Sequence, residues 1–117
     1  MVRKFLIILI LLFLSACTTE KYGKEVDRNL KKISIRDAIV DPSYVGKKLN
    51  LEGVIVTQCQ AAGCWFFLKD DTGIIYIDLS KEGFTIPPKT GKKALVTGTV
   101  VKREENIIIE ASGVEIR

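Results

Sequence analysis

Five segments after residue 48 have the length and composition of β-strands and are separated by turn-forming residues. In the first of them Leu49, Leu51 and Ile55 share one face, while Asn50 and Glu52 share the other. Five strands within about 85 residues can bury their apolar residues only if the sheet closes on itself. The sequence therefore predicts an all-β, five-stranded barrel, with strands at residues 49–56, 65–69, 74–79, 94–102 and 107–116.

The connections between these segments carry turn-forming residues. Residues 70–73 and 104–106 have the composition of tight turns and predict two hairpins. Residues 80–91 contain two prolines and no helical period, so we expect irregular chain there. Ser112 and Gly113 predict a break or bend in the last strand.

A short helix is predicted before the first strand. Ser34 suits the N-cap position, and Asp37 follows three residues later. Pro42 disfavours a helical conformation at Asp41, so the helix should end there.

The chain begins with the pattern of an exported protein. Two basic residues precede ten apolar ones, 5–14, which is about half the length needed to span a bilayer. Residues 14–17 end this run at Cys17 and resemble the lipobox of bacterial lipoproteins. The resemblance implies that residues 1–16 are a removed signal peptide and that acylated Cys17 anchors the chain to the outside of a membrane. The neutral Thr18 implies the outer membrane where a bacterium has two.

The segment after the cysteine is polar and mixed in charge. It predicts a flexible, lipid-linked tether at residues 17–32, followed by the barrel domain at residues 33–117. The spacing of Val26 and Leu30 leaves open a short helix that docks on the domain instead.

Charge and composition limit the chemistry of the mature chain. Without residues 1–16 it keeps 16 of the 18 basic residues and all 14 acidic ones, which gives a side-chain charge of +2. That charge is far below that of a strongly basic polymer-binding domain. The chain has no histidine, the most frequent general base and metal ligand. We therefore expect a protein that is not an enzyme and that needs no cofactor.

Several motifs along the strands resemble the OB-fold of the anticodon-binding and single-strand-binding type. They lie at residues 46–49, 52–56, 65–75, 91–93 and 96–100. The resemblance implies that the five strands form an OB-fold-like Greek-key barrel. In nucleic-acid-binding OB-folds, bases stack on aromatic residues of the second and third strands. The resemblance implies that Trp65, Phe67 and Tyr76 contact a ligand.

The alternation leaves the role of these aromatic residues open. Trp65 and Phe67 share one face of their strand, and Phe66 and Leu68 share the other, so either pair could fill the barrel. If Trp65 and Phe67 point outward, they form a platform for a planar ligand or pack beneath the helix or a loop.

Two lysine pairs are further candidate ligand contacts. Lys47 and Lys48 precede the first strand, and Lys92 and Lys93 precede the fourth. They could bind phosphates or stand in solvent at the strand ends. The modest charge and the exported location argue against nucleic acid as the partner.

Cys59 and Cys64 flank a four-residue connection between the first two strands. Residues opposite each other in a hairpin lie close enough for a disulfide, and an exported chain meets oxidising conditions. With Cys17 acylated the two thiols form an even pair, so a Cys59–Cys64 disulfide is predicted. A two-thiolate copper(I) site and a redox-active pair are alternatives, the second weakened because the loop has no basic side chain. The run through Trp65 also resembles that of small uncharacterised envelope proteins with a Gly-Cys-Trp motif.

Together these features predict a lipoprotein of the bacterial cell envelope whose OB-fold domain binds something without transforming it. Its partners would be the lipid bilayer, through Cys17, and an envelope protein or small ligand. A copper-binding or redox module on the same fold is one alternative, and a nucleic-acid-binding domain is another.

Overall fold

The computed structural model describes residues 19–117, so the predicted signal peptide and the acylation of Cys17 lie outside the described residues. Within this range, no helix is long and apolar enough to cross a membrane. The elements are β1 (Glu20–Gly23), α2 (Ile35–Val40), a 3-10 helix (Pro42–Tyr44), β2 (Lys48–Gln58), β3 (Trp65–Lys69), β4 (Ile74–Asp78), a second 3-10 helix (Ser80–Glu82), β5 (Lys93–Arg103) and β6 (Asn106–Ile116).

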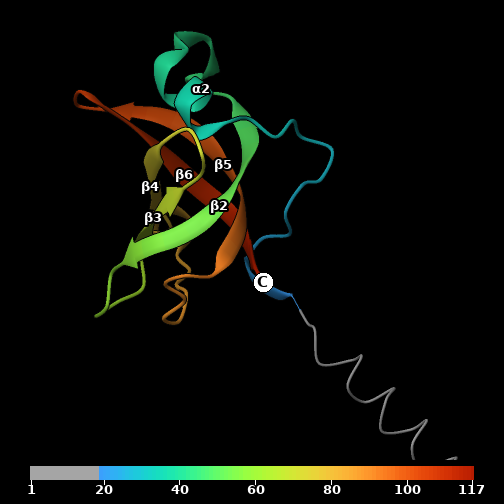
Figure 1. Ribbon diagram of the computed structural model, residues 1–117, viewed down its shortest axis with the longest axis vertical. Helices are drawn as coiled ribbons and strands as arrows, with labels where there is room; N and C mark the ends of the chain where they lie inside the picture. The colour runs from blue at the N-terminus through green and yellow to red at the C-terminus, as the bar shows by residue number, and fades with distance from the viewer. Residues whose placement is uncertain (1–18) are drawn as a thin grey trace, which may run out of the picture.

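Strands β2 to β6 form the predicted five-stranded barrel (Figure 1). β2, β3 and β4 are antiparallel neighbours, β4 runs parallel to β6, and β5 closes the barrel between β6 and β2. The bend predicted in the last strand is a β-bulge. Thr97 pairs with Gly113 and Gly98 with Ala111, which leaves Ser112 as the extra residue.

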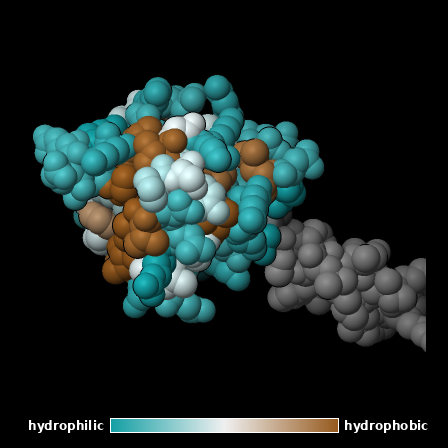
Figure 2. Space-filling model, turned by 90° about the horizontal axis from the view of Figure 1, so that it is seen from above, coloured by the Kyte–Doolittle hydropathy of each residue, from teal (hydrophilic) through white to brown (hydrophobic). Residues whose placement is uncertain are grey.

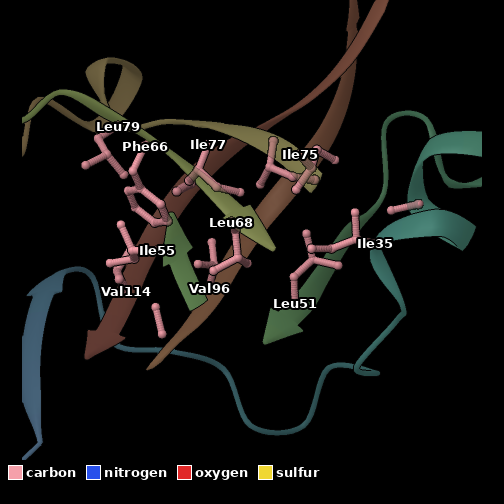
Figure 3. Packing of buried hydrophobic residues seen from close by; sticks show 14 of the residues in the cluster. Ile35, Leu51, Ile55, Phe66, Leu68, Ile75, Ile77, Leu79, Val96 and Val114 are labelled. Carbon is pink, nitrogen blue, oxygen red and sulfur yellow. The ribbon is translucent and has the colours of Figure 1, made fainter. Parts of the chain in front are cut away.

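Alternate positions of the strands fill the barrel interior. On β2, Leu51 and Ile55 are fully buried, whereas Val54 between them is exposed. On β3, Phe66 and Leu68 are fully buried, and both side chains point into the same interior as the other labelled core residues (Figure 3). The choice between the two pairs on β3 is thereby decided, because Phe66 and Leu68 occupy the core.

The predicted helix forms as α2 and covers the end of the barrel where β4 begins (Figure 1). The Ser34 hydroxyl accepts a hydrogen bond from the Asp37 backbone N–H at 3.1 Å and so caps the helix. Ile35 and Ala38 are fully buried. The Asp70 carboxylate in the β3–β4 turn accepts a hydrogen bond from the Ile35 N–H at 2.9 Å, which fastens α2 to that turn.

Residues 20–33, here called the strap, pack on the barrel. The prediction of a flexible tether at residues 17–32 is wrong for this part of the chain, and the helix considered around Val26 and Leu30 does not form either. Instead β1 pairs antiparallel with the last four residues of β6, from Gly113 to Ile116. Val26 of the strap is 5% exposed, and Ile33 at its end belongs to the hydrophobic core.

Buried polar groups of the barrel wall hold the strap. The Thr97 hydroxyl accepts a hydrogen bond from the Asp27 N–H at 3.1 Å and donates one to the Asn50 amide oxygen at 2.5 Å. The Asn50 amide nitrogen donates to the Asp27 carbonyl at 2.8 Å. Arg28 pairs with Glu115, a buried carboxylate of β6. These partners are distant in sequence, and for that reason local composition did not predict the contact.

A glycine allows the strap to approach β6 closely. A Cβ atom at Gly113 would lie 2.1 Å from the carbonyl oxygen of Lys24, far inside contact distance. The Lys24 N–H donates to the neighbouring Ser112 carbonyl at 2.8 Å. The two backbones can therefore make contact at this point only because residue 113 has no side chain.

Candidate binding face and thiol loop

Three aromatic side chains form a cluster on the outer face of β3 and β4. Trp65 and Phe67 alternate with the core residues of β3, and Tyr76 lies opposite Phe67 on β4. The Trp65 and Tyr76 rings are stacked, with centroids 5.7 Å apart and planes inclined by 25°. Phe67 meets the ring of Trp65 edge-on at 5.8 Å and that of Tyr76 at 5.4 Å. All three are partly exposed, so the three candidates from the sequence stand together on an outward face.

A groove of about 740 Å³ opens beside this cluster, between α2, β4 and the β5–β6 hairpin. Phe67 and Tyr76 line it together with Ile39 of α2, Ile74 of β4 and Ile107 of β6. Figure 2, which views the molecule from the α2 end, shows apolar residues gathered in a patch that polar residues surround. The groove exists because β4 and β6 have just two registered pairs, at the far end of β4, and do not pair where β4 begins.

An ion network borders the aromatic cluster. Asp78, two residues after Tyr76 on β4, is 5% exposed, and its carboxylate accepts hydrogen bonds from Ser80 and from Arg103, the latter at 3.0 Å. Arg103 also lies 3.5 Å from the Glu110 carboxylate. Burial disfavours the charged form of Asp78, but the hydrogen bonds from Ser80 and Arg103 outweigh it and lower the pKa. Burial, followed by the charge of Asp78, raises the pKa of Tyr76, so its hydroxyl stays protonated and can donate.

The two lysine pairs do not form one patch. Lys48 pairs with Thr99 and Lys93 with Val54, so the two pairs stand at opposite ends of the β2–β5 ladder. All four lysines are exposed, and the Lys93 ammonium lies 3.4 Å from the Glu52 carboxylate. The structure therefore does not bring Lys47, Lys48, Lys92 and Lys93 together with the aromatic cluster.

Cys59 and Cys64 stand at the two ends of the β2–β3 connection, 4.1 Å apart, with both thiols free and half-buried. The Cys59 N–H donates to the Trp65 carbonyl at 3.1 Å, and the Gly63 N–H donates to the Cys59 carbonyl at 3.0 Å. Gly63 has a φ of 61°, which favours glycine. The loop therefore places the two cysteines side by side, next to Trp65.

The two thiols have unequal surroundings. The Cys59 sulfur accepts a hydrogen bond from the Ala62 N–H at 3.4 Å. This bond, aided by the neighbouring amides of Gly63 and Ala61, lowers the pKa of Cys59 against the effect of burial. Burial, together with its contact with Cys59, raises the pKa of Cys64. Cys59 is therefore the thiol that ionises first.

The β2–β3 connection, residues 59–64, here called the thiol loop, rests on the chain that follows β4. The Leu79 N–H donates to the Cys64 carbonyl at 2.9 Å, and the Ile86 N–H donates to the Gly63 carbonyl at 3.0 Å. A Cβ atom at Gly63 would lie 2.3 Å from the Ile86 carbonyl oxygen, so the contact also depends on glycine. Between residues 19 and 117, no group of three or more histidine, cysteine or acidic side chains is placed to hold a metal ion.

Sequence reasoning missed the polar part of this region. Asp78 stands two residues after Tyr76 on a strand that was predicted, and that spacing is the signal that would have placed it on the same face. Arg103 and Glu104 come from the β5–β6 hairpin and reach the groove through the closure of the barrel. No local pattern marks them.

No protein-family model matches this chain, and no curated protein matches it either. Among solved structures it is similar to the hypothetical protein ygiW from E. coli, with a TM-score of 0.58 and 19% identity over 81% of this chain and 99% of that one. The barrel is an OB-fold. A putative aspartyl-tRNA synthetase from Leishmania major Friedlin is also similar, with a TM-score of 0.59 and 13% identity. That match covers 80% of this chain and 22% of the synthetase.

At such identities the likeness concerns the OB-fold alone. β3 and β4 are the second and third strands of the barrel, and the aromatic cluster lies on both. The thiol loop joins the first two barrel strands, and the hairpin beside the groove joins the last two.

Proposed function

We propose that this protein is a lipid-anchored protein of the bacterial cell envelope whose OB-fold barrel binds a ligand without transforming it. The outward cluster of Trp65, Phe67 and Tyr76, which opens onto the apolar groove, carries the proposal. Apolar area that stays in contact with water favours a partner that covers it. OB-folds bind oligonucleotides and oligosaccharides on the face of their second and third strands, which is where this cluster lies.

The likeness of residues 14–17 to a lipobox supports the anchor, and an anchor at Cys17 would orient the barrel. Glu20 lies three residues after Cys17, so even a fully extended connection reaches only about 10 Å. β1 begins beside the end of β6, whereas α2 and the groove lie at the opposite end of the barrel (Figure 1). An acylated Cys17 would thus hold the barrel against the bilayer and turn the groove toward the aqueous space.

Charge favours a ligand other than nucleic acid. The mature side-chain charge is +2, and the two lysine pairs lie apart from each other. Arg103, which lines the groove, contacts both Asp78 and Glu110 and has little positive charge left to offer a phosphate. A glycan or an envelope protein suits a face of aromatic rings and neutralised charges better.

In the exported protein we expect Cys59 and Cys64 to form a disulfide. The two residues already lie 4.1 Å apart in a hairpin connection. Closing this short ring contributes about 2 kcal/mol by the loop-entropy relation. A loss of two hydrogens in the intact mass, reversed by reductant, is the expected result, and two freely alkylated thiols in the exported protein would contradict it.

The adjacent thiols also support copper(I) binding as a second candidate function. Two thiolates can bind this soft monovalent ion without histidine. A titration of the reduced protein with copper(I) should then saturate at one ion, and a Cys59→Ser variant should lose that ion. Absence of saturable binding would remove this candidate.

The anchor can be tested on the full chain. Expressed in a bacterium, it should fractionate with membranes and carry an acyl mass on the peptide that begins at Cys17. Cys17→Ser should abolish the acyl mass, and Cys59→Ser is the matched control that should keep it. A soluble, unmodified wild-type protein would contradict the anchor.

The binding face has a built-in reporter, because Trp65 is the single tryptophan of the chain. We would titrate the full chain with chitohexaose as a glycan probe and with a 20-nucleotide oligothymidylate, at physiological salt. Trp65 emission should change with the glycan, remain unchanged with the oligonucleotide, and lose its response in Tyr76→Ala but not in Lys92→Ala. A tight response to the oligonucleotide would favour nucleic acid instead.

A further inference from the structure

The thiol loop has no basic side chain to stabilise a thiolate, but its backbone provides an N–H donor to the Cys59 sulfur. No basic residue lies between Cys59 and Cys64, yet the turn directs the Ala62 N–H at the Cys59 sulfur, at 3.4 Å. Amide donors around a sulfur stabilise its thiolate in the same way as a nearby positive charge. A stabilised thiolate favours the reduced form of a cysteine pair and makes the corresponding disulfide easier to reduce.

The loop can change redox state without moving the barrel. Cys59 is held by its hydrogen bond to the Trp65 carbonyl, and Cys64 is held by the hydrogen bond from Leu79. Both anchoring bonds involve the backbone and are present with the thiols free and 4.1 Å apart. Formation of the S–S bond requires a shift of the two side chains within this frame.

The loop is also open to a reaction partner. The three residues that follow Cys59 are all exposed: Gln60, Ala61 and Ala62. Cys59 itself is half-buried. Another molecule's disulfide can therefore approach Cys59, whereas burial and the contact with Cys59 raise the pKa of Cys64.

We propose that Cys59 and Cys64 form a thiol–disulfide exchange pair, with Cys59 as the attacking thiolate and Cys64 as the resolving thiol. The Cys59 thiolate attacks one sulfur of a partner's disulfide, and the other sulfur leaves as a thiolate. The Cys64 thiol, after losing its proton, then attacks the Cys59 sulfur and releases the second partner sulfur as a thiolate. The partner's disulfide is reduced to two thiols, the Cys59–Cys64 pair is oxidised, and the reverse sequence returns the disulfide. The exchange proposal depends on the proposed function in one respect, the location of the protein in an oxidising compartment.

The first experiment measures the two thiols separately. The reduced full chain in detergent is alkylated with iodoacetamide at pH 7, and mass spectrometry follows each cysteine, with Cys17 on its own peptide. Cys59 should react about ten times faster than Cys64 or more. Equal rates, or a faster Cys64, would overturn the assignment of roles.

A pair of proline variants tests the backbone donor. Ala62→Pro removes the N–H that points at the Cys59 sulfur, and the excess reactivity of Cys59 should fall by a factor of about three or more. Gln60→Pro is the control, because it takes an N–H with no bond to the sulfur from a turn position that accepts proline. An unchanged ratio in folded Ala62→Pro would refute the role of that donor.

Glutathione buffers test exchange itself and do not depend on the proline variants. Reduced and oxidised samples of the full chain should converge on the same mixture, and Cys64→Ser should accumulate a glutathione adduct on Cys59. A pair that stays oxidised at every glutathione ratio is a structural disulfide, and that outcome overturns the proposal. Ligand binding is read separately from Trp65 emission, so either function can fail alone.

Discussion

The strap lies against β6 at Gly113, and Gly113→Ala should release it. A Cβ atom at this position would lie 2.1 Å from the Lys24 carbonyl oxygen, a distance that no packed side chain adopts. The strap should lose the hydrogen bond from Lys24 to Ser112, worth about 0.5–1.5 kcal/mol, and the burial of Val26, worth about 1.5–3 kcal/mol. The local opening free energy should therefore fall by roughly 2–4 kcal/mol.

Hydrogen exchange of the full chain measures this directly. A loss of that size lowers amide protection in the strap by about 30- to 1,000-fold, while amides of β2 and β3 should change far less. Gly73→Ala is the matched control, because its new Cβ would meet Ile35 at an ordinary 3.5 Å. If Lys24 and Asp27 keep wild-type protection in Gly113→Ala, the reasoning about close approach is refuted.

Three further predictions concern the core, the pH response and the aromatic cluster. Phe66 is fully buried, so Phe66→Ala should lower the unfolding free energy by about 3–5 kcal/mol in a denaturant titration, and a loss below 1 kcal/mol would contradict its place in the core. Burial opposes ionisation of Asp70, but bonds from Thr72, Ile35 and Gly73 prevail and hold its pKa below the ordinary 3.8. Its stabilisation is therefore present above that ordinary value and lost as the pH falls through the lowered one, and Asp70→Asn should flatten the acid limb of a stability–pH curve. Tyr76→Ala removes the ring stacked on Trp65 and should shift Trp65 emission, whereas Lys92→Ala should leave it unchanged.

The five barrel strands were predictable because each has a strand-like composition and is bounded by turn-forming residues. The period-two pattern of β2 predicted the shared face of Leu49, Leu51 and Ile55, all of which are buried, and composition predicted a turn between β5 and β6. On β3 the pattern could not choose between two apolar pairs. Phe66 and Leu68 occupy the interior because of the way β3 is placed between β2 and β4, which no single strand encodes.

The packing of the strap on the barrel could not be predicted from the sequence. β1 has four residues and one apolar side chain, Tyr22, so it lacks the pattern of a strand. What holds it is a set of groups far along the chain, above all Thr97 and Asn50, whose polar side chains gave no sign of burial. The thiol loop is similar, because the sequence predicted the nearness of Cys59 and Cys64 but not the amide that faces one of them.

The pairing of β1 with β6 has a consequence for the boundary of the folding unit. β4 does not reach the last residues of β6, and β1 occupies the edge that they would otherwise expose. A fragment that begins at residue 33 would leave this edge open, along with the buried Glu115 that Arg28 pairs with. Open strand edges template pairing between molecules. By covering this edge, the strap disfavours self-association. A fragment that keeps the edge covered should begin at or before Glu20.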